Sequence, residues 1–164
     1  MKARRITLLL FILVTIIFLL NTGISRSIKN WYAYSKINFI EQKLDLAISN
    51  SMNIENLKVN KELISGDGKD NDPSVTLNLN EDYMHSLNLH IKVGEADSLQ
   101  LFYLNEDDQG FNEIKSLKYS LSPGDNSVEL QIPYGDSSKK MTSIRIDPVQ
   151  TNQHFIISDV YINK

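Results

Sequence analysis

An arginine and an aspartate stand two residues apart in the segment Ile144-Arg145-Ile146-Asp147-Pro148. Because strand side chains alternate between the two faces of a sheet, Arg145 points away from Ile144 and Ile146 and lies on a polar face. Asp147 precedes a proline, which favours an extended backbone and ends the strand there. A guanidinium and a carboxylate at one sheet end form planar hydrogen bonds. Such a pair suits either a hydroxyl-rich ligand such as a sugar or a brace for the next loop, and the brace is the more ordinary role.

Aromatic side chains offer a second kind of chemistry, because an exposed flat ring can contact the apolar face of a sugar. Tyr103 shares a row with leucines and is expected in the core, whereas Phe102 falls on the opposite face of the same strand. Phe111 and Tyr134 fall in turns. We therefore expect Phe102, Phe111 and Tyr134 to bind ligand together with Arg145 and Asp147. Single exposed aromatic residues are also ordinary on protein surfaces.

Three aspartates, Asp67, Asp70 and Asp72, lie in a loop that also contains glycine and asparagine. Calcium binds six to eight oxygen ligands from loops of this composition. However, the spacing is not that of an EF-hand, and Lys69 adds a positive charge. Asp and Asn also favour turns through hydrogen bonds to their own backbone. We expect a turn without a metal, with these three aspartates as the calcium candidates.

Catalytic motifs are not apparent. The chain has no cysteine, which excludes thiol catalysis and cysteine-bound metals. Its three histidines, His85, His90 and His154, share no metal-ligand spacing, and the Gly-x-Ser-x-Gly and His-Glu-x-x-His motifs are missing. A glycosidase needs two carboxyl groups about 5–10 Å apart across a cleft, which a sandwich of this length has little chain to build. We expect a protein that is not an enzyme and has no cofactor.

The charge balance narrows the choice of partners. The net charge is −3 at pH 7, and three of the positive charges lie among the first five residues. The remaining chain is therefore acidic and lacks the positive surplus that binds phosphate backbones or anionic lipid. We expect no nucleic-acid partner.

From about residue 54 onward, apolar residues recur at every second position in short runs, which predicts β-strands with one buried face. Turn-forming clusters of Gly, Pro, Asn and Asp separate the runs. This pattern predicts a mainly β fold, an antiparallel β-sandwich or jelly roll over residues 54–164. The expected strands lie within residues 57–64, 75–79, 87–93, 99–103, 117–121, 128–132, 144–146 and 155–162.

The N-terminal residues predict a membrane segment. The run Ile6–Leu20 carries no charge and follows Lys2, Arg4 and Arg5. Extended to residue 24 it reaches the length of a spanning helix, and no Ala-x-Ala cleavage site follows. We expect residues 1–24 to form a single-pass anchor that enters the membrane through residues 6–24, with a cleaved signal peptide as the alternative. The positive residues place the N-terminus in the cytoplasm and the β domain outside the cell membrane.

Residues 25–53 are expected to form a juxtamembrane segment. Its aromatic residues, Trp31, Tyr32 and Tyr34, suit a membrane surface. Apolar residues at spacings of three and four predict a short amphipathic helix from about Tyr34 to Ser49.

Several segments in this order resemble a known family: Asn71-Asp72-Pro73, Leu99-Gln100-Leu101-Phe102-Tyr103, Gly110-Phe111-Asn112-Glu113, Ile132-Pro133 and Ile144-Arg145-Ile146-Asp147-Pro148. They are similar to carbohydrate-binding-module-like β-sandwich domains of bacterial cell-envelope polysaccharide proteins, which often occur beside membrane glycosyltransferases. The resemblance covers about residues 60–164. It implies a membrane-anchored, extracytoplasmic, non-catalytic accessory module that binds or helps to assemble cell-surface glycan. The alternative is a protein–protein accessory subunit of a larger membrane enzyme complex of envelope polysaccharide synthesis, such as one containing a glycosyltransferase.

Overall fold

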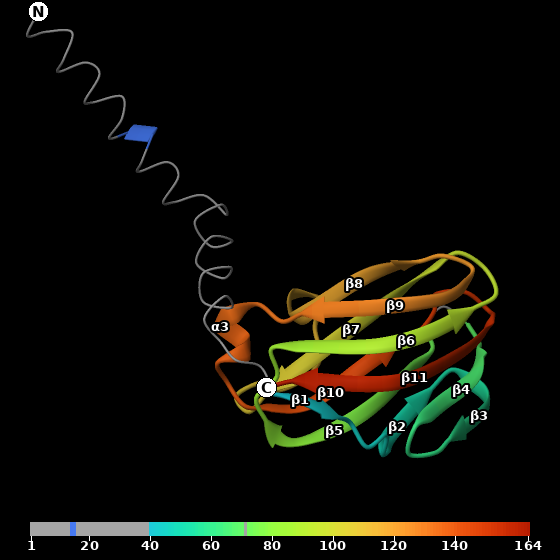
Figure 1. The fold of residues 1–164 in the computed structure, drawn as a ribbon, viewed down its shortest axis with the longest axis horizontal. Coiled ribbons are helices and arrows are strands. Elements are labelled where there is room, and N and C mark those ends of the chain that lie inside the picture. The colour runs from blue at the N-terminus through green and yellow to red at the C-terminus, as the bar shows by residue number, and fades with distance from the viewer. Residues whose placement is uncertain (1–13, 16–39, 71) are drawn as a thin grey trace, which may run out of the picture. The chain divides into compact units, whose positions relative to one another are not determined.

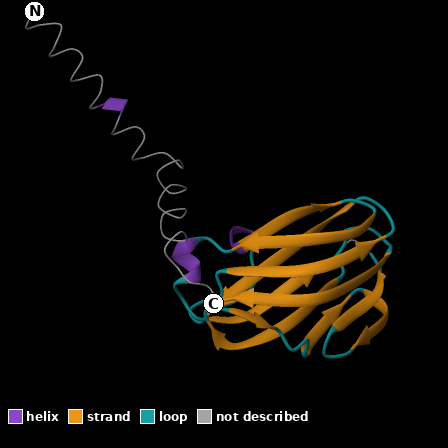
Figure 2. Cartoon of the chain, viewed as in Figure 1, coloured by secondary structure: helices purple, strands orange, loops and turns teal. Residues whose placement is uncertain are grey.

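Two antiparallel β-sheets pack face to face and form a sandwich (Figure 1, Figure 2). The computed structural model describes residues 14–15, 40–70 and 72–164. The first sheet, sheet A, has the order β3-β4-β11-β6-β9, with β1 beside the end of β11. Its strands are β1 (Glu41–Lys43), β3 (Ile54–Val59), β4 (Leu63–Gly68), β6 (Ser86–Val93), β9 (Gly124–Gln131) and β11 (His154–Asn163).

The second sheet, sheet B, has the order β2-β5-β10-β7-β8. Its strands are β2 (Ile48–Met52), β5 (Ser74–Asp82), β7 (Asp97–Asn105), β8 (Ser116–Leu121) and β10 (Met141–Asp147). A short 3₁₀ helix, η1 (Glu113–Lys115), precedes β8, and one helical turn, α3 (Tyr134–Ser137), follows β9. All strand pairs are antiparallel.

The alternating pattern of the sequence decides which side of each strand is buried. In β6, Leu87, Leu89, Ile91 and Val93 are buried in the core, while the residues between them face outward. The facing sheet contributes the inward rows of β5, β7 and β10 to the same core. Burying one such side chain stabilises the fold by about 1.5–3 kcal/mol, and with no disulfide this burial holds the two sheets together. The predicted β-sandwich is confirmed.

The predicted helix from Tyr34 to Ser49 is wrong over its described part. Residues 41–43 and 48–52 are strands, so the sandwich begins before residue 54. Leu44, Leu46 and Ile48 also stand at every second position, and this period of two prevails because β11 and β5 offer unpaired edges there. A helix with its apolar residues at spacings of three and four would bury Ile40 together with Leu44, whereas the Ile40 side chain is 70% exposed.

The predicted membrane anchor lies almost entirely outside the described residues, as do Trp31, Tyr32 and Tyr34. Within the part of the chain that the structure describes, no helix has the length and apolar character needed to cross a membrane.

Asp97 connects two loops at one end of the sandwich. Its carboxylate accepts hydrogen bonds from the backbone N–H groups of Ser98, Gln150 and Thr151, at 2.7, 2.9 and 3.2 Å. The Thr151 hydroxyl and the Gln153 side-chain amide also donate to it, at 2.7 and 2.6 Å. The Gln153 carbonyl in turn accepts from the backbone of the turn after β6. The loop between β10 and β11 is therefore fixed against the turn between β6 and β7.

Replacing Asp97 with alanine is expected to cost on the order of 1–3 kcal/mol of unfolding free energy, because several donors lose their partner. Burial raises the pKa of this carboxyl, but the hydrogen bonds from Thr151, Gln150, Ser98 and Gln153 outweigh it, so the pKa lies below 3.8. A carboxyl whose pKa is lower in the folded state than in the unfolded state stabilises the fold at any pH above its unfolded-state pKa. This stabilisation is lost as the pH falls through its folded-state pKa. In urea unfolding, the free energies of unfolding of wild type and D97A should therefore show their full difference near neutral pH and converge below pH 3.8. A pH-independent difference would contradict this account.

Candidate functional site

A pocket of about 460 Å³ lies on the outward face of sheet B. The strand register explains its composition, because Arg145 lies opposite Phe102, and Gln100 lies between Asp147 and Lys118. The inward neighbours of Arg145, Phe102 and Gln100 are buried in the core, and those of Lys118 are partly buried against it. The residues that line the pocket are Asp72, Gln100, Phe102, Phe111, Asn112, Glu113, Lys118, Arg145, Asp147 and Gln150.

Arg145 occupies the centre of a charged array within the pocket. Its Nε and one terminal nitrogen donate to the two oxygens of Asp147, both at 2.8 Å. The same terminal nitrogen donates to Asp72 Oδ1 at 2.6 Å. Asp147 is 1% exposed, and paired geometry of this kind is among the strongest that side chains make. The predicted planar pair between Arg145 and Asp147 is therefore present, and Asp72 extends it.

Burial is the main cause that raises the pKa of Asp147 to about 6. The Arg145 guanidinium opposes this shift, and the neighbouring charge of Asp72 adds to it. The pKa of Arg145 is also raised, since the attraction of Asp147 and Asp72 outweighs the effect of its burial. Arg145 therefore stays charged, while Asp147 loses its charge under mildly acidic conditions.

Phe102 lies beneath the arginine. The Arg145 guanidinium carbon sits 4.9 Å from the centroid of the Phe102 ring, which is a cation–π contact. The phenylalanine is 5% exposed, so it supports Arg145 and does not offer an open platform. Phe111 is partly exposed in the loop before η1 and contributes an aromatic ring to the pocket lining.

The loop that carries Phe111 is fixed by its own hydrogen bonds. The Asn112 carbonyl Oδ1 accepts from the backbone N–H groups of Ile114 and Lys115, at 3.1 and 3.2 Å, and so begins η1. The Gln100 amide donates to Glu113 Oε2 at 2.9 Å and to the Ser116 hydroxyl at 3.0 Å. Strand β7 therefore positions this loop against the outward face of sheet B.

Four of the five predicted binding residues line this pocket, namely Phe102, Phe111, Arg145 and Asp147. Tyr134 does not, because it lies in α3, where its side chain is 41% exposed. Sequence reasoning did not include the other lining residues Gln100, Asn112, Glu113, Lys118 and Gln150 among the expected binding residues. Gln100 carried a signal, since it is a polar residue two positions before Phe102 and therefore shares its outward row.

Two of the three calcium candidates, Asp67 and Asp72, have different partners. Asp67 pairs with His154 Nδ1 at 2.7 Å and accepts from Asn56 at 2.6 Å, whereas Asp72 pairs with Arg145. Asp70 adopts a left-handed backbone with φ of 60°, as expected of an aspartate in a turn. Among the described residues, no three His, Cys, Asp or Glu side chains are grouped to hold a metal ion.

Comparison with solved structures finds carbohydrate-binding modules. A low-affinity xylan-binding module, CBM86 from Roseburia intestinalis, has a TM-score of 0.56 at 10% identity, covering 78% of this chain and 96% of that one. A family 29 module from Piromyces equi has a TM-score of 0.52 at 8% identity, covering 77% and 91%. A family 4 module has a TM-score of 0.50 at 10% identity, covering 77% and 86%. At these identities the likeness concerns the fold.

No protein-family model matches the sequence, and no curated protein matches it.

Replacing Arg145 with methionine is expected to cost about 3–5 kcal/mol of unfolding free energy, because Asp147 is left buried without a partner. Lys118→Met is the matched control, since Lys118 is an exposed cation on the rim of the same pocket, and its effect should stay within about 0.5 kcal/mol. The double variant R145M/D147L should recover most of the loss. Chemical unfolding of the four proteins measures this, and equal losses in R145M and K118M would show that the ion pair is not structural.

Proposed function

We propose that the pocket on the outward face of sheet B binds glycan without catalysing a reaction on it. The arrangement of Arg145 with Asp147 and Asp72, beside Gln100 and Phe111, carries this proposal. Carboxylates, amides and a guanidinium at fixed positions match the alternating donors and acceptors of sugar hydroxyls. Phe111 adds an apolar surface of the kind that contacts a pyranose ring. The fold supports the same conclusion, since a module of similar fold binds xylan.

The state of Asp147 argues against hydrolysis. Its raised pKa and the nearby Glu113 resemble the two carboxyl groups that a glycosidase requires. However, both Asp147 oxygens are held by Arg145, and the side chain is buried, so it is not free to protonate a leaving group. Glu113 is engaged by the Gln100 amide. These carboxyls are arranged for recognition.

The charges of the lining residues favour an uncharged glycan. The carboxylates of Asp72, Glu113 and Asp147 outnumber the two cations, Arg145 and Lys118. A glycan rich in carboxylate or phosphate would meet net repulsion there.

The proposal includes the location of the protein. The apolar run from residue 6 to residue 24 supports a single-pass anchor, and the positive residues before it support an outward-facing sandwich. In this position the module would hold or help to assemble envelope polysaccharide, next to a membrane glycosyltransferase or another membrane protein of that pathway.

Phe111→Ala is expected to lower glycan affinity at least tenfold, which corresponds to about 1.4 kcal/mol. The control is Tyr134→Ala, because Tyr134 is an exposed aromatic residue that does not line the pocket. Titration of the full chain in mild detergent with xylan oligosaccharides and a broad panel of envelope glycans measures both variants. If no glycan binds at millimolar concentration, or if the two alanine variants lose affinity equally, the proposed site is wrong.

Glycan affinity is expected to fall as pH decreases from 7 to 5. Asp147 is charged above its pKa of about 6 and accepts a proton below it, which weakens its hold on Arg145. Asp147→Asn carries no titrating group at this position, so its affinity should be lower at pH 7 and nearly constant over the range. Calorimetric titration at pH 5, 6 and 7 tests this, and parallel pH profiles for the two proteins would rule out Asp147 as the cause.

A further inference from the structure

Strand β5 has a complete partner on one edge and half a partner on the other. On one edge, β10 pairs with it as far as Asp82, which lies opposite Met141. On the other edge, β2 pairs with it only from Ser74 to Leu77. In the part of the chain that the structure describes, no strand pairs with this second edge from Asn78 to Asp82.

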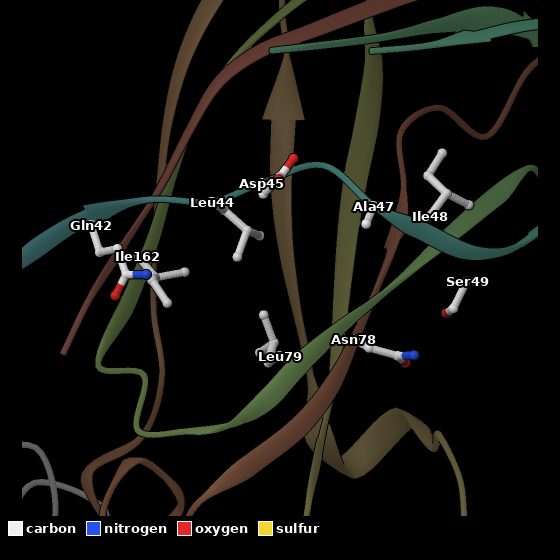
Figure 3. Close-up of a pocket in the computed structure, with 9 residues that line it drawn as sticks. All are labelled: Gln42, Leu44, Asp45, Ala47, Ile48, Ser49, Asn78, Leu79 and Ile162. Atoms are coloured by element: carbon white, nitrogen blue, oxygen red, sulfur yellow. The ribbon is translucent and has the colours of Figure 1, made fainter. Parts of the chain in front are cut away.

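The course of the chain before β2 explains this gap. Strand β1 belongs to sheet A, where it pairs with the end of β11. The chain then crosses to sheet B between Lys43 and Ile48, so it meets β5 only at Leu77. Figure 3 shows the crossing segment and β5 running apart, with Leu44 on one and Leu79 on the other.

A pocket of about 460 Å³ fills the space between the crossing segment and β5. Leu79 and Ile162, which both belong to the core, lie at its base, and Leu44 and Ile48 line it from the crossing segment. Its remaining lining residues are Gln42, Asp45, Ala47, Ser49 and Asn78 (Figure 3). The unpaired edge of β5 therefore adjoins a pocket with apolar side chains at its base.

The unpaired edge of β5 and the adjoining pocket together favour a ligand with an extended backbone. The backbone N–H and C=O groups along an unpaired strand edge bind another extended chain, which adds a strand to the sheet. In an added strand every second side chain points to the same face, so one apolar side chain can enter the pocket while its neighbours stay outside. A compact ligand would not pair with the row of backbone groups along the edge.

The charge near this edge narrows the choice further. Asp45 is exposed at the pocket, and its carboxylate makes no hydrogen bond or ion pair with the described residues. A strand with lysine or arginine next to its apolar residues would be attracted.

We propose that the edge of β5 from Asn78 to Asp82 is a docking site for an extended segment of another protein, in which apolar residues alternate with basic ones. The segment pairs with β5 where β2 stops and places one apolar side chain between Leu44 and Leu79. This site involves the sheet edge and the opening between the sheets, so it is separate from the glycan pocket on the outward face of sheet B.

Hydrogen exchange of the full chain in mild detergent tests the proposal with two synthetic peptides. The first is KVTVKVTVK, and the second is EVTVEVTVE, which has the same apolar residues and opposite charge. The basic peptide at millimolar concentration should slow exchange at least tenfold for those amides of Asn78–Asp82 that face the free edge, and leave the edge strand β9 unchanged. No slowing, equal slowing by both peptides, or equal slowing at β9 would overturn the proposal.

A variant that fills the pocket provides the second test. Ala47 is exposed and lines the pocket, so Ala47→Trp should occupy the space and abolish the protection. Ala96→Trp is the matched control, because Ala96 is equally an exposed alanine but lies in the turn after β6. Protection lost in A47W and kept in A96W supports the docking site. Protection kept in a folded A47W protein, or lost in both variants, overturns it, and the peptide comparison in wild type decides the question if A47W does not fold.

Discussion

The alternation of side chains along each strand is the constraint on which the rest of this structure depends. Ile144 and Ile146 must face the other sheet, because a chain without cysteine has no disulfides and depends mainly on burial of its apolar side chains. The same geometry forces Arg145 and Asp147 onto one outward row, two residues apart. The core and the pocket therefore follow from a single pattern, and a shift of register by one residue would destroy both.

Burying the Asp147 carboxylate in this outward row costs hydration free energy, whereas burying the apolar side chains of the core does not. Removing Asp147 from water disfavours its charged form, as its raised pKa shows. Arg145 offsets this cost with two hydrogen bonds and rests on the Phe102 ring. A well-packed apolar pair at these positions would often be at least as stable. Stability alone therefore does not account for the charged array, whereas the proposed glycan recognition would, because a rigid array keeps donors and acceptors at fixed positions before a ligand arrives.

The strands and the facing of their side chains could be predicted from the sequence wherever they depend on alternation of apolar and polar residues within one segment. The strands from β4 onward, the pairing of Arg145 with Asp147 and the inward position of Tyr103 follow from alternation within single segments. Tyr103 also shows the limit of this reasoning, because its hydroxyl donates to Asp136 in α3, 33 residues away. Contacts of this kind depend on how distant strands align.

Pairing between distant strands also explains the missed lining residues and the wrongly predicted helix. Gln100 and Lys118 reach the pocket through the pairing of β7, β8 and β10, and Gln150 reaches it from the loop after β10; a single sequence reveals neither arrangement. The segment from Ile40 to Ser49 fits both a helical and a strand period, and the free edges of β11 and β5 decide between them. Local preference gives way where the fold supplies a partner.

The position of β11 affects the order in which the sandwich can assemble. This strand lies inside sheet A and pairs with β4, β6 and β1, all of which the ribosome makes earlier. Until residues 154–163 emerge, those three strands lack their common neighbour, and half of the sandwich cannot close. Closure of sheet A therefore depends on long-range pairing between β11 and strands made much earlier, and pairing of this kind slows folding.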